Sequence, residues 1–131
     1  MRKVIIIAVL LCFALVAPAL ANDWTRINDE IDINTRNKIV RAYVLHEDYN
    51  ETRDLAKEVI VNYIKTLTTG RERTNLGTLF NTRPALLGKV QHAVSLNIGK
   101  ESSTRVPNGA SVYYTFDLKL LKPIIPDINL P

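Results

Sequence analysis

The sequence has very little cysteine and histidine, and these absences exclude several kinds of chemistry. Of 131 residues, one is a cysteine, Cys12, and two are histidines, His46 and His92. A disulfide framework needs paired cysteines, and a zinc site needs several histidine, cysteine or carboxylate ligands. The sequence also contains no nucleophile elbow, phosphate-binding loop, dinucleotide fingerprint or His-Glu-x-x-His motif. We therefore expect no catalytic residue, no cofactor and no metal, and a protein that is not an enzyme.

Long apolar runs are rare as well, and the one at the N-terminus has the features of a secretion signal. Arg2 and Lys3 form a basic start, residues 4–17 are apolar, and a small-x-small cleavage site ends at Ala21. A membrane-spanning helix needs about 20 apolar residues, which this run does not reach. We predict a cleaved signal peptide over residues 1–21. The mature protein would be secreted and extracellular, or periplasmic if the source is a Gram-negative bacterium.

Cleavage at this site would also remove most of the excess of positive charge. The precursor carries a formal net charge of +4, and the loss of Arg2 and Lys3 leaves a mature net charge of +2. Acidic and basic residues are interspersed, so they form no continuous phosphate-binding stripe. We expect no nucleic-acid partner and no stable membrane insertion. Without Cys12, packing and backbone pairing must provide all the stability of the mature domain.

Hydrophobic periodicity predicts one long helix near the middle of the chain. Between residues 50 and 67, apolar side chains recur at spacings of three and four and so share one stripe. Asn50 is expected to cap this helix and Gly70 to end it. Upstream, residues 38–46 fit either a helix or a strand, and their β-branched and aromatic content favours a strand.

Two later segments alternate with a period of two and predict an antiparallel hairpin. These segments are residues 89–98 and residues 111–121. The polar stretch 99–110 between them contains Pro107-Asn108-Gly109, a strong turn signal, and is expected to form a long exposed loop. Residues 70–88 are rich in turn signals and are expected to hold at most a short strand.

Together these elements predict an α+β fold of two layers, with one amphipathic helix packed on a small antiparallel sheet. Residues 22–122 would form a single small domain. The prolines in residues 123–131 disfavour a helix, so we expect an extended Pro-rich C-terminal tail. This tail either packs on the domain or docks on a partner.

Residues 38–121 resemble the cystatin family in topology, with one long helix and an antiparallel sheet in a secreted domain of similar length. The resemblance implies a frame on which peptidase inhibitors are built. Gln91 to Ser95 departs from the family's Gln-x-Val-x-Gly loop, and Trp24 lies at the opposite end of the chain from the family's Pro-Trp loop. The inhibitory residues of the family are therefore not carried over to this chain.

By elimination, we expect a secreted non-enzymatic protein that binds another macromolecule, for example a host-defence or immune-modulating effector. One alternative is a secreted peptidase inhibitor on a cystatin-like frame. Another is a carrier of a small apolar ligand between helix and sheet, suggested by Tyr63, Tyr114 and Phe116. Binding residues are common on loops held by a rigid sheet, and an apolar tail can dock on a partner. The candidate partner contacts are Arg105, Val106, Pro107 and Asn108 in the loop and Ile124, Ile125 and Ile128 in the tail.

Three further positions each have a competing structural explanation. Asn50 begins the single N-glycosylation sequon, Asn50-Glu51-Thr52, so it is either a glycosylation candidate or the helix cap. His46, Glu47 and Asp48 are potential metal ligands, but acidic residues are expected just before a helix, and we interpret them as a solvated turn. We interpret His92, on the apolar face of its predicted strand, as a structural histidine with one hydrogen bond.

The exported protein is expected to begin at Asn22 and to contain no thiol. Because Cys12 leaves with the signal peptide, the midpoint of thermal unfolding should be the same with and without dithiothreitol. Mass spectrometry of exported material measures the cleavage site and also reports any glycan at Asn50. Retention of Cys12, or a lower unfolding midpoint in reductant, would contradict the prediction.

Overall fold

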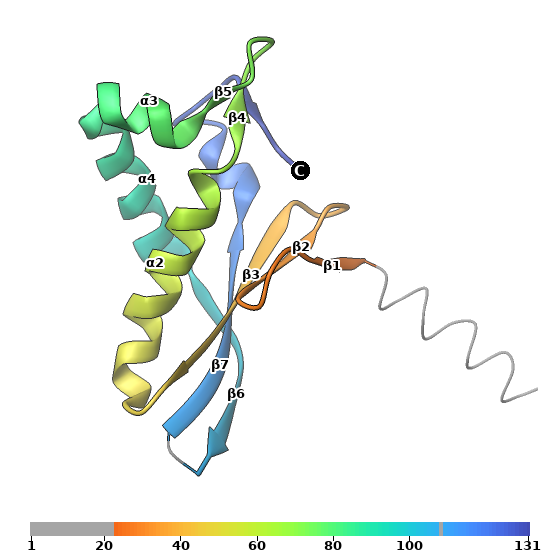
Figure 1. The fold of residues 1–131 in the computed structure, drawn as a ribbon, viewed down its shortest axis with the longest axis vertical. Helices are drawn as coiled ribbons and strands as arrows, with labels where there is room; N and C mark the ends of the chain where they lie inside the picture. Colours follow the sequence, from red (N-terminus) through yellow and green to blue (C-terminus); the bar gives the residue numbers. More distant parts are fainter. Residues whose placement is uncertain (1–22, 108) are drawn as a thin grey trace, which may run out of the picture.

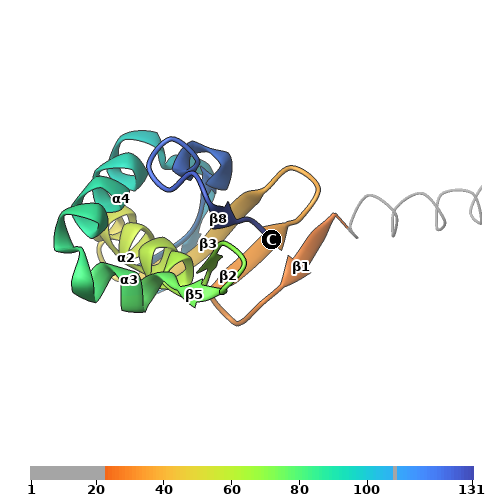
Figure 2. The same cartoon turned by 90° about the horizontal axis from the view of Figure 1, so that it is seen from above.

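The computed structural model describes residues 23–107 and 109–131, which form helices packed against one face of an antiparallel sheet (Figures 1 and 2). The predicted signal peptide, residues 1–21, lies outside the described residues. In chain order the elements are β1 (Trp24–Arg26), β2 (Ile31–Asn34), β3 (Ile39–His46), the 3-10 helix η1 (Tyr49–Glu51), α2 (Thr52–Ile64), β4 (Thr68–Thr69), β5 (Thr74–Asn75), α3 (Leu76–Thr82), α4 (Pro84–Asn97), β6 (Gly99–Val106), β7 (Gly109–Asp117), the 3-10 helix η2 (Leu118–Leu121) and β8 (Ile128–Asn129). The mixed α and β class predicted from the sequence is confirmed, but the described residues contain three α-helices instead of one, and a second sheet.

The main sheet has five antiparallel strands in the order β1-β2-β3-β7-β6. Its centre is the pairing of β3 with β7, in which Arg41 lies opposite Thr115 and Tyr43 lies opposite Tyr113. The preference for a strand over residues 38–46 is therefore confirmed. The second sheet is small, with the order β5-β4-β8, and joins the C-terminal residues to the segment after α2.

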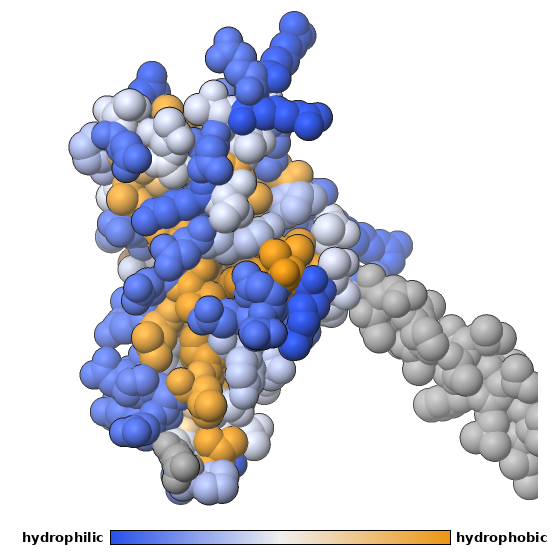
Figure 3. All heavy atoms as spheres, viewed as in Figure 1, coloured by the Kyte–Doolittle hydropathy of each residue, from blue (hydrophilic) through white to orange (hydrophobic). Residues whose placement is uncertain are grey.

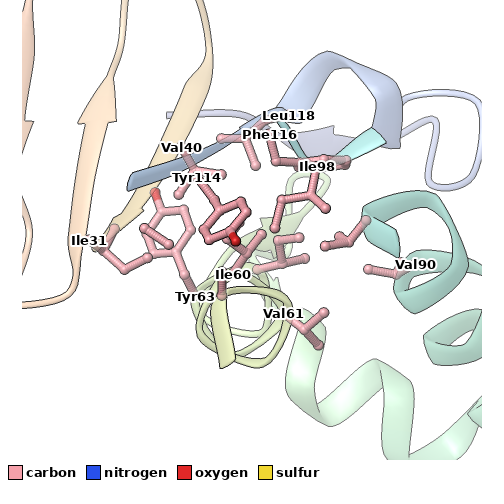
Figure 4. Packing of buried hydrophobic residues seen from close by; sticks show 14 of the residues in the cluster. Ile31, Val40, Ile60, Val61, Tyr63, Val90, Ile98, Tyr114, Phe116 and Leu118 are labelled. Atoms are coloured by element: carbon pink, nitrogen blue, oxygen red, sulfur yellow. The ribbon is translucent and has the colours of Figure 1, made fainter. Parts of the chain in front are cut away.

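The core lies between α2, α4 and the inner face of the main sheet (Figure 4). Alternate residues of β3 and β7 point into it, because successive side chains of a strand face opposite ways. From α2, Ile60 and Ile64 are fully buried, whereas Leu55 and Val59 are only partly buried. Burial raises the pKa of Tyr63, because the charged phenolate is disfavoured away from water. The strand residues that form the inner face are Val40, Ala42, Val44, Val112, Tyr114 and Phe116.

Helix α2 begins at Thr52, and Asn50 is not its capping residue. A 3-10 turn precedes the helix, and the Asp48 carboxylate accepts a hydrogen bond of 2.9 Å from the Asn50 N–H. Asp48 therefore caps η1, whereas Glu51, the residue before α2, makes no side-chain capping hydrogen bond, and Asn50 lies exposed inside η1. Thr52 is fully buried, donates a hydrogen bond of 2.6 Å to the Tyr49 carbonyl and lies 2.9 Å from the Tyr114 hydroxyl. The complete sequon is thus accessible only before the helix packs.

The predicted strand over residues 89–98 is wrong, because this segment belongs to helix α4, Pro84–Asn97. Proline fits the first turn of a helix, where its missing N–H costs nothing. Val90, Val94 and Ile98 are buried and lie four residues apart. Residues with this spacing share a face in a strand as well as in a helix, so the pattern fits both. His92 and Leu96, which would share that strand face, are exposed instead. The short strand allowed for residues 70–88 is also partly wrong, because Leu79 and Phe80 lie in helix α3.

A hairpin is present, but it differs from the predicted one, because its first strand is the segment expected to be a loop. Residues 99–106 form β6, an edge strand that pairs with β7 and has a register shift between Lys100 and Ser102. An edge strand hydrogen-bonds on one side only and can be polar on both faces, so its composition resembles that of a loop. β6 ends at Val106 and β7 begins at Gly109, so Pro107-Asn108-Gly109 lies where the two strands meet in the sequence, and Asn108 is outside the described residues. The second predicted strand, residues 111–121, continues as β7 to Asp117 and then becomes η2.

The C-terminal tail packs on the domain and is not extended throughout. Residues 122–124 form a turn, and β8 pairs with β4. Ile125 and Ile128 are 3% and 2% exposed and belong to the main core, while Ile124 is partly buried against it. The Lys38 ammonium also donates a hydrogen bond to the Pro131 carbonyl. Ile125 and Ile128 therefore contribute to stability and do not offer exposed side chains to a partner.

Gly109 is expected to be the glycine least tolerant of substitution, because β7 passes very close to the end of β3 there. A Cβ at Gly109 would lie 2.1 Å from the His46 carbonyl oxygen, and the φ of Gly109 is +152°. Gly109→Ala should lower the free energy of unfolding by about 3 kcal/mol. Gly88→Ala is the matched control, because a Cβ at Gly88 meets nothing within 4 Å and alanine favours a helix by about 1 kcal/mol. Urea unfolding of both variants measures the difference, and equal stabilities would contradict the packing described.

Candidate functional site

The candidate contacts predicted in the loop lie at the end of the β6–β7 hairpin. Arg105 and Pro107 are exposed and Val106 is half-buried, whereas Asn108 is outside the described residues. A surface groove of about 560 Å³ runs beside this end of the hairpin. Its lining joins the hairpin to the turn before α2 and consists of Glu47, Tyr49, Ser103, Thr104, Arg105, Val106, Gly109 and Ala110.

Tyr49 and Lys100 stabilise the position of β6 against η1 at this groove. The Lys100 ammonium donates a hydrogen bond of 2.6 Å to the Tyr49 hydroxyl, and this bond raises the pKa of Lys100. Both side chains are exposed, so the contact is a solvated one. The groove is therefore a mixed polar surface, without a buried polar group that points to a ligand.

The His46, Glu47 and Asp48 segment forms the turn after β3. The Asp48 N–H donates a hydrogen bond of 2.9 Å to Nδ1 of His46, and Glu47 and Asp48 are exposed. Within residues 23–107 and 109–131, no group of three histidine, cysteine, aspartate or glutamate side chains is placed to hold a metal ion. Over the same residues, no helix has the length and apolar character needed to cross a membrane.

A more organised group of side chains lies on the sheet face turned away from the helices. Arg41, on the central strand β3, has a side chain that is 21% exposed. Its Nη2 and Nε lie 2.9 and 3.3 Å from the Asp32 carboxylate, and its Nη1 lies 3.5 Å from Glu101. Arg26 adds a weaker contact of 3.4 Å to Asp32. We call these residues, together with Trp24, Tyr43 and Tyr113, the open-face cluster.

Aromatic rings flank the guanidinium group of Arg41. Its Cζ lies 4.1 Å from the ring centroid of Trp24 and 5.1 Å from that of Tyr113. Tyr113 in turn packs on Tyr43, with ring centroids 5.1 Å apart and planes at 54°. A planar guanidinium that stacks on rings and forms a fork to a carboxylate is held in one orientation. The cluster is thus an ordered aromatic surface, with two positive and two negative charges beside it.

Sequence analysis missed this cluster because its residues come from all five strands. If residues 38–46 are a strand, Arg41 and Tyr43 lie on one of its faces, and the alternation in residues 111–121 places Tyr113 on the polar face of the second strand. Pairing these two strands with each other would have brought the three together. Trp24 and Glu101 could not be added, because β1 and β6 were not predicted as strands.

Comparisons of the chain with protein-family models, with curated proteins and with solved structures found no match. Function therefore has to follow from the chemistry of the surfaces themselves.

Replacing Arg41 is expected to destabilise the sheet and to change the environment of Trp24. Arg41→Met should lower the free energy of unfolding by about 2 kcal/mol, because the mostly buried Asp32 carboxylate would keep only the longer contact to Arg26. Trp24 is the only tryptophan, so a red shift of protein fluorescence would report loss of the stack directly.

Two further variants distinguish this network from ordinary surface charge. Arg41→Lys should lose roughly half as much stability, since lysine keeps the charge but neither the fork nor the planar stack. Arg26→Ala should change stability by less than about 0.5 kcal/mol, because the Arg26 side chain is 63% exposed. If Arg41→Met and Arg26→Ala were equally stable, the central role of Arg41 would be wrong.

Proposed function

We propose that this chain is an exported, non-enzymatic binding protein that recognises another protein through the open-face cluster. A host-defence or immune-modulating effector is one kind of protein that acts in this way. The single observation that carries the proposal is the stack of Trp24, Arg41 and Tyr113 on the sheet face opposite the helices. Tryptophan, tyrosine and arginine are the residue types that most often dominate the binding energy of protein interfaces.

The physical state of the cluster supports this proposal. Trp24, Tyr43 and Tyr113 are half-buried, so each presents part of its ring to solvent in a fixed position. Ordered side chains lose little further conformational entropy when a partner covers them. Leu45, on the same face of β3 and 57% exposed, extends the apolar surface beyond the rings.

The charges beside the rings favour a protein over a polyanion. Arg26 and Arg41 are balanced by Asp32 and Glu101, which lie within 3.5 Å of them. A surface that binds nucleic acid would instead present unpaired basic groups to the phosphates. The cluster thus provides aromatic contact area with little net charge.

A peptidase inhibitor is the second candidate, supported by the shape of the β6–β7 hairpin. The end of the hairpin lies at the end of the molecule away from the C-terminus (Figure 1). Gly109 lies very close to His46 at this end, and Pro107 is exposed. An exposed hairpin end is a suitable shape for entering a peptidase cleft, whereas the open-face cluster suits a broader partner.

Comparative capture of partners from the fluid into which the protein is exported tests the proposal. Wild-type protein and the Tyr113→Ser variant are used as baits, and a captured protein is then purified and titrated. We expect its binding to change the fluorescence of Trp24 and to weaken at least tenfold with Tyr113→Ser.

Tyr49→Ser is the matched control, because Tyr49 is 43% exposed but lies at the hairpin groove. It should bind the captured partner like the wild type. Equal binding by Tyr113→Ser would reject the open-face cluster. Capture of a peptidase that is lost only when Val106 and Pro107 are replaced by serine would establish the inhibitor instead.

A further inference from the structure

A second surface lies between α2 and the turn that joins β1 to β2, on the opposite side of the sheet from the open-face cluster. It is a groove of about 400 Å³. Figure 3 shows an apolar band between α2 and the sheet, with hydrophilic surface on both sides. Ile27, Leu55 and Val59 contribute the accessible apolar surface of the groove, and the buried Ile31 and Tyr63 lie beneath them (Figure 4).

The turn that forms one wall of this groove is rigid. The Asn28 carboxamide oxygen accepts hydrogen bonds of 2.8 and 3.0 Å from the N–H groups of Glu30 and Ile31. The Ile27 N–H donates a hydrogen bond of 2.9 Å to the Ile31 carbonyl. Ile27 is therefore held 51% exposed at the groove, although burial of an isoleucine side chain is favourable.

The other wall is the side of α2 that the sheet covers incompletely. Leu55 and Val59 are four residues apart, so they lie one above the other on this side of the helix. Both are only partly buried, whereas Ala56 and Ile60 beside them are fully buried. The apolar stripe of α2 is thus wider than the surface that the domain itself covers.

The rim of the groove is acidic. Glu30 lies on the turn and Glu58 lies on α2, and no lysine or arginine is among the described residues that line the groove. Within residues 23–107 and 109–131, neither carboxylate forms an ion pair. Lys57, next to Glu58, instead contacts Asp54 at 2.8 Å, and this contact holds the pKa of Asp54 below its usual value.

We propose that this groove binds a cationic amphipathic segment of a partner protein. Its apolar side chains would cover Ile27, Leu55 and Val59, and its lysine or arginine side chains would pair with Glu30 and Glu58. This is the helix-in-groove mode of recognition, in which an apolar stripe gives affinity and rim charges select the partner. The charge of the rim disfavours an anionic membrane surface or a nucleic acid as the occupant.

A synthetic peptide of leucine and lysine, roughly 14 residues long so that it can form a helix, is the probe. Fluorescence anisotropy of the labelled peptide measures its binding to the wild-type protein. We expect saturable binding with one peptide per chain, and no binding of the same peptide with glutamate in place of lysine. Equal binding of both peptides, or no binding of the lysine peptide, would overturn the proposal.

Variants locate the binding on the protein. Glu58→Lys should weaken binding of the lysine peptide about tenfold, because it replaces attraction by repulsion at the rim. Val59→Ser should also weaken it, because Val59 contributes accessible apolar surface to the α2 wall of the groove. Glu72→Lys makes the same change of charge at an exposed position outside the groove, and should bind like the wild type. If Glu72→Lys weakened binding as much as Glu58→Lys, the binding would reflect net charge and the groove would be rejected.

This proposal stands apart from recognition through the open-face cluster. Tyr113→Ser, which alters that cluster, should leave binding of the lysine peptide unchanged. Loss of peptide binding in Tyr113→Ser would contradict a separate site in the groove. Failure of the captured partner to depend on Tyr113 would reject the open-face cluster and leave the groove intact.

Discussion

The guanidinium group of Arg41 links all five strands of the main sheet. It lies on the central strand β3 and contacts Trp24 of β1, Asp32 of β2, Glu101 of β6 and Tyr113 of β7. The inner face of the sheet is stabilised by burial against the helices. The outer face has no such layer among the described residues, so its side chains must contact one another. A single arginine can do this because its planar group stacks on rings and bonds carboxylates in its own plane at the same time.

The inner face depends on a different constraint, which is the fit of α2 to β3 and β7. Thr52 is fully buried at the start of α2, and its hydroxyl lies 2.9 Å from that of Tyr114. Each hydroxyl thereby gives the other a hydrogen-bond partner that would otherwise be lost on burial. At the other end of α2, the C-terminal tail covers the core with Ile125 and Ile128 and pairs with β4. In a domain of this size, covering both ends of the core in this way buries apolar surface that a sheet and one helix would leave exposed.

Elements with an unambiguous hydrophobic periodicity could be predicted from the sequence. The helix α2 and the strand β7 were predicted because their apolar residues recur with one period only. Strand β3, whose pattern fits either a helix or a strand, was predicted from its β-branched and aromatic content. Helix α4 was missed because Val90, Val94 and Ile98 fit a period of two as well as a spacing of four, and because residues 70–88, which contain its first turn, were interpreted as turn-rich. Strand β6 was missed because an edge strand with polar residues on both faces has no apolar alternation. The open-face cluster needed both edge strands, so it could not be assembled from local patterns.

The β1–β2 hairpin connects the two surfaces that the chain presents. It extends beyond the helices (Figure 2), so each of its faces contributes to a different surface. Trp24 and Asp32 belong to the open-face cluster, whereas Ile27 and Glu30 form one wall of the acidic groove. Strand β1 has only three residues, and a ladder that short is weak without further contacts. The stack of Trp24 on Arg41 therefore adds to the contacts that hold β1 on the sheet, whereas the groove wall is held by the pairing of β2 with β3.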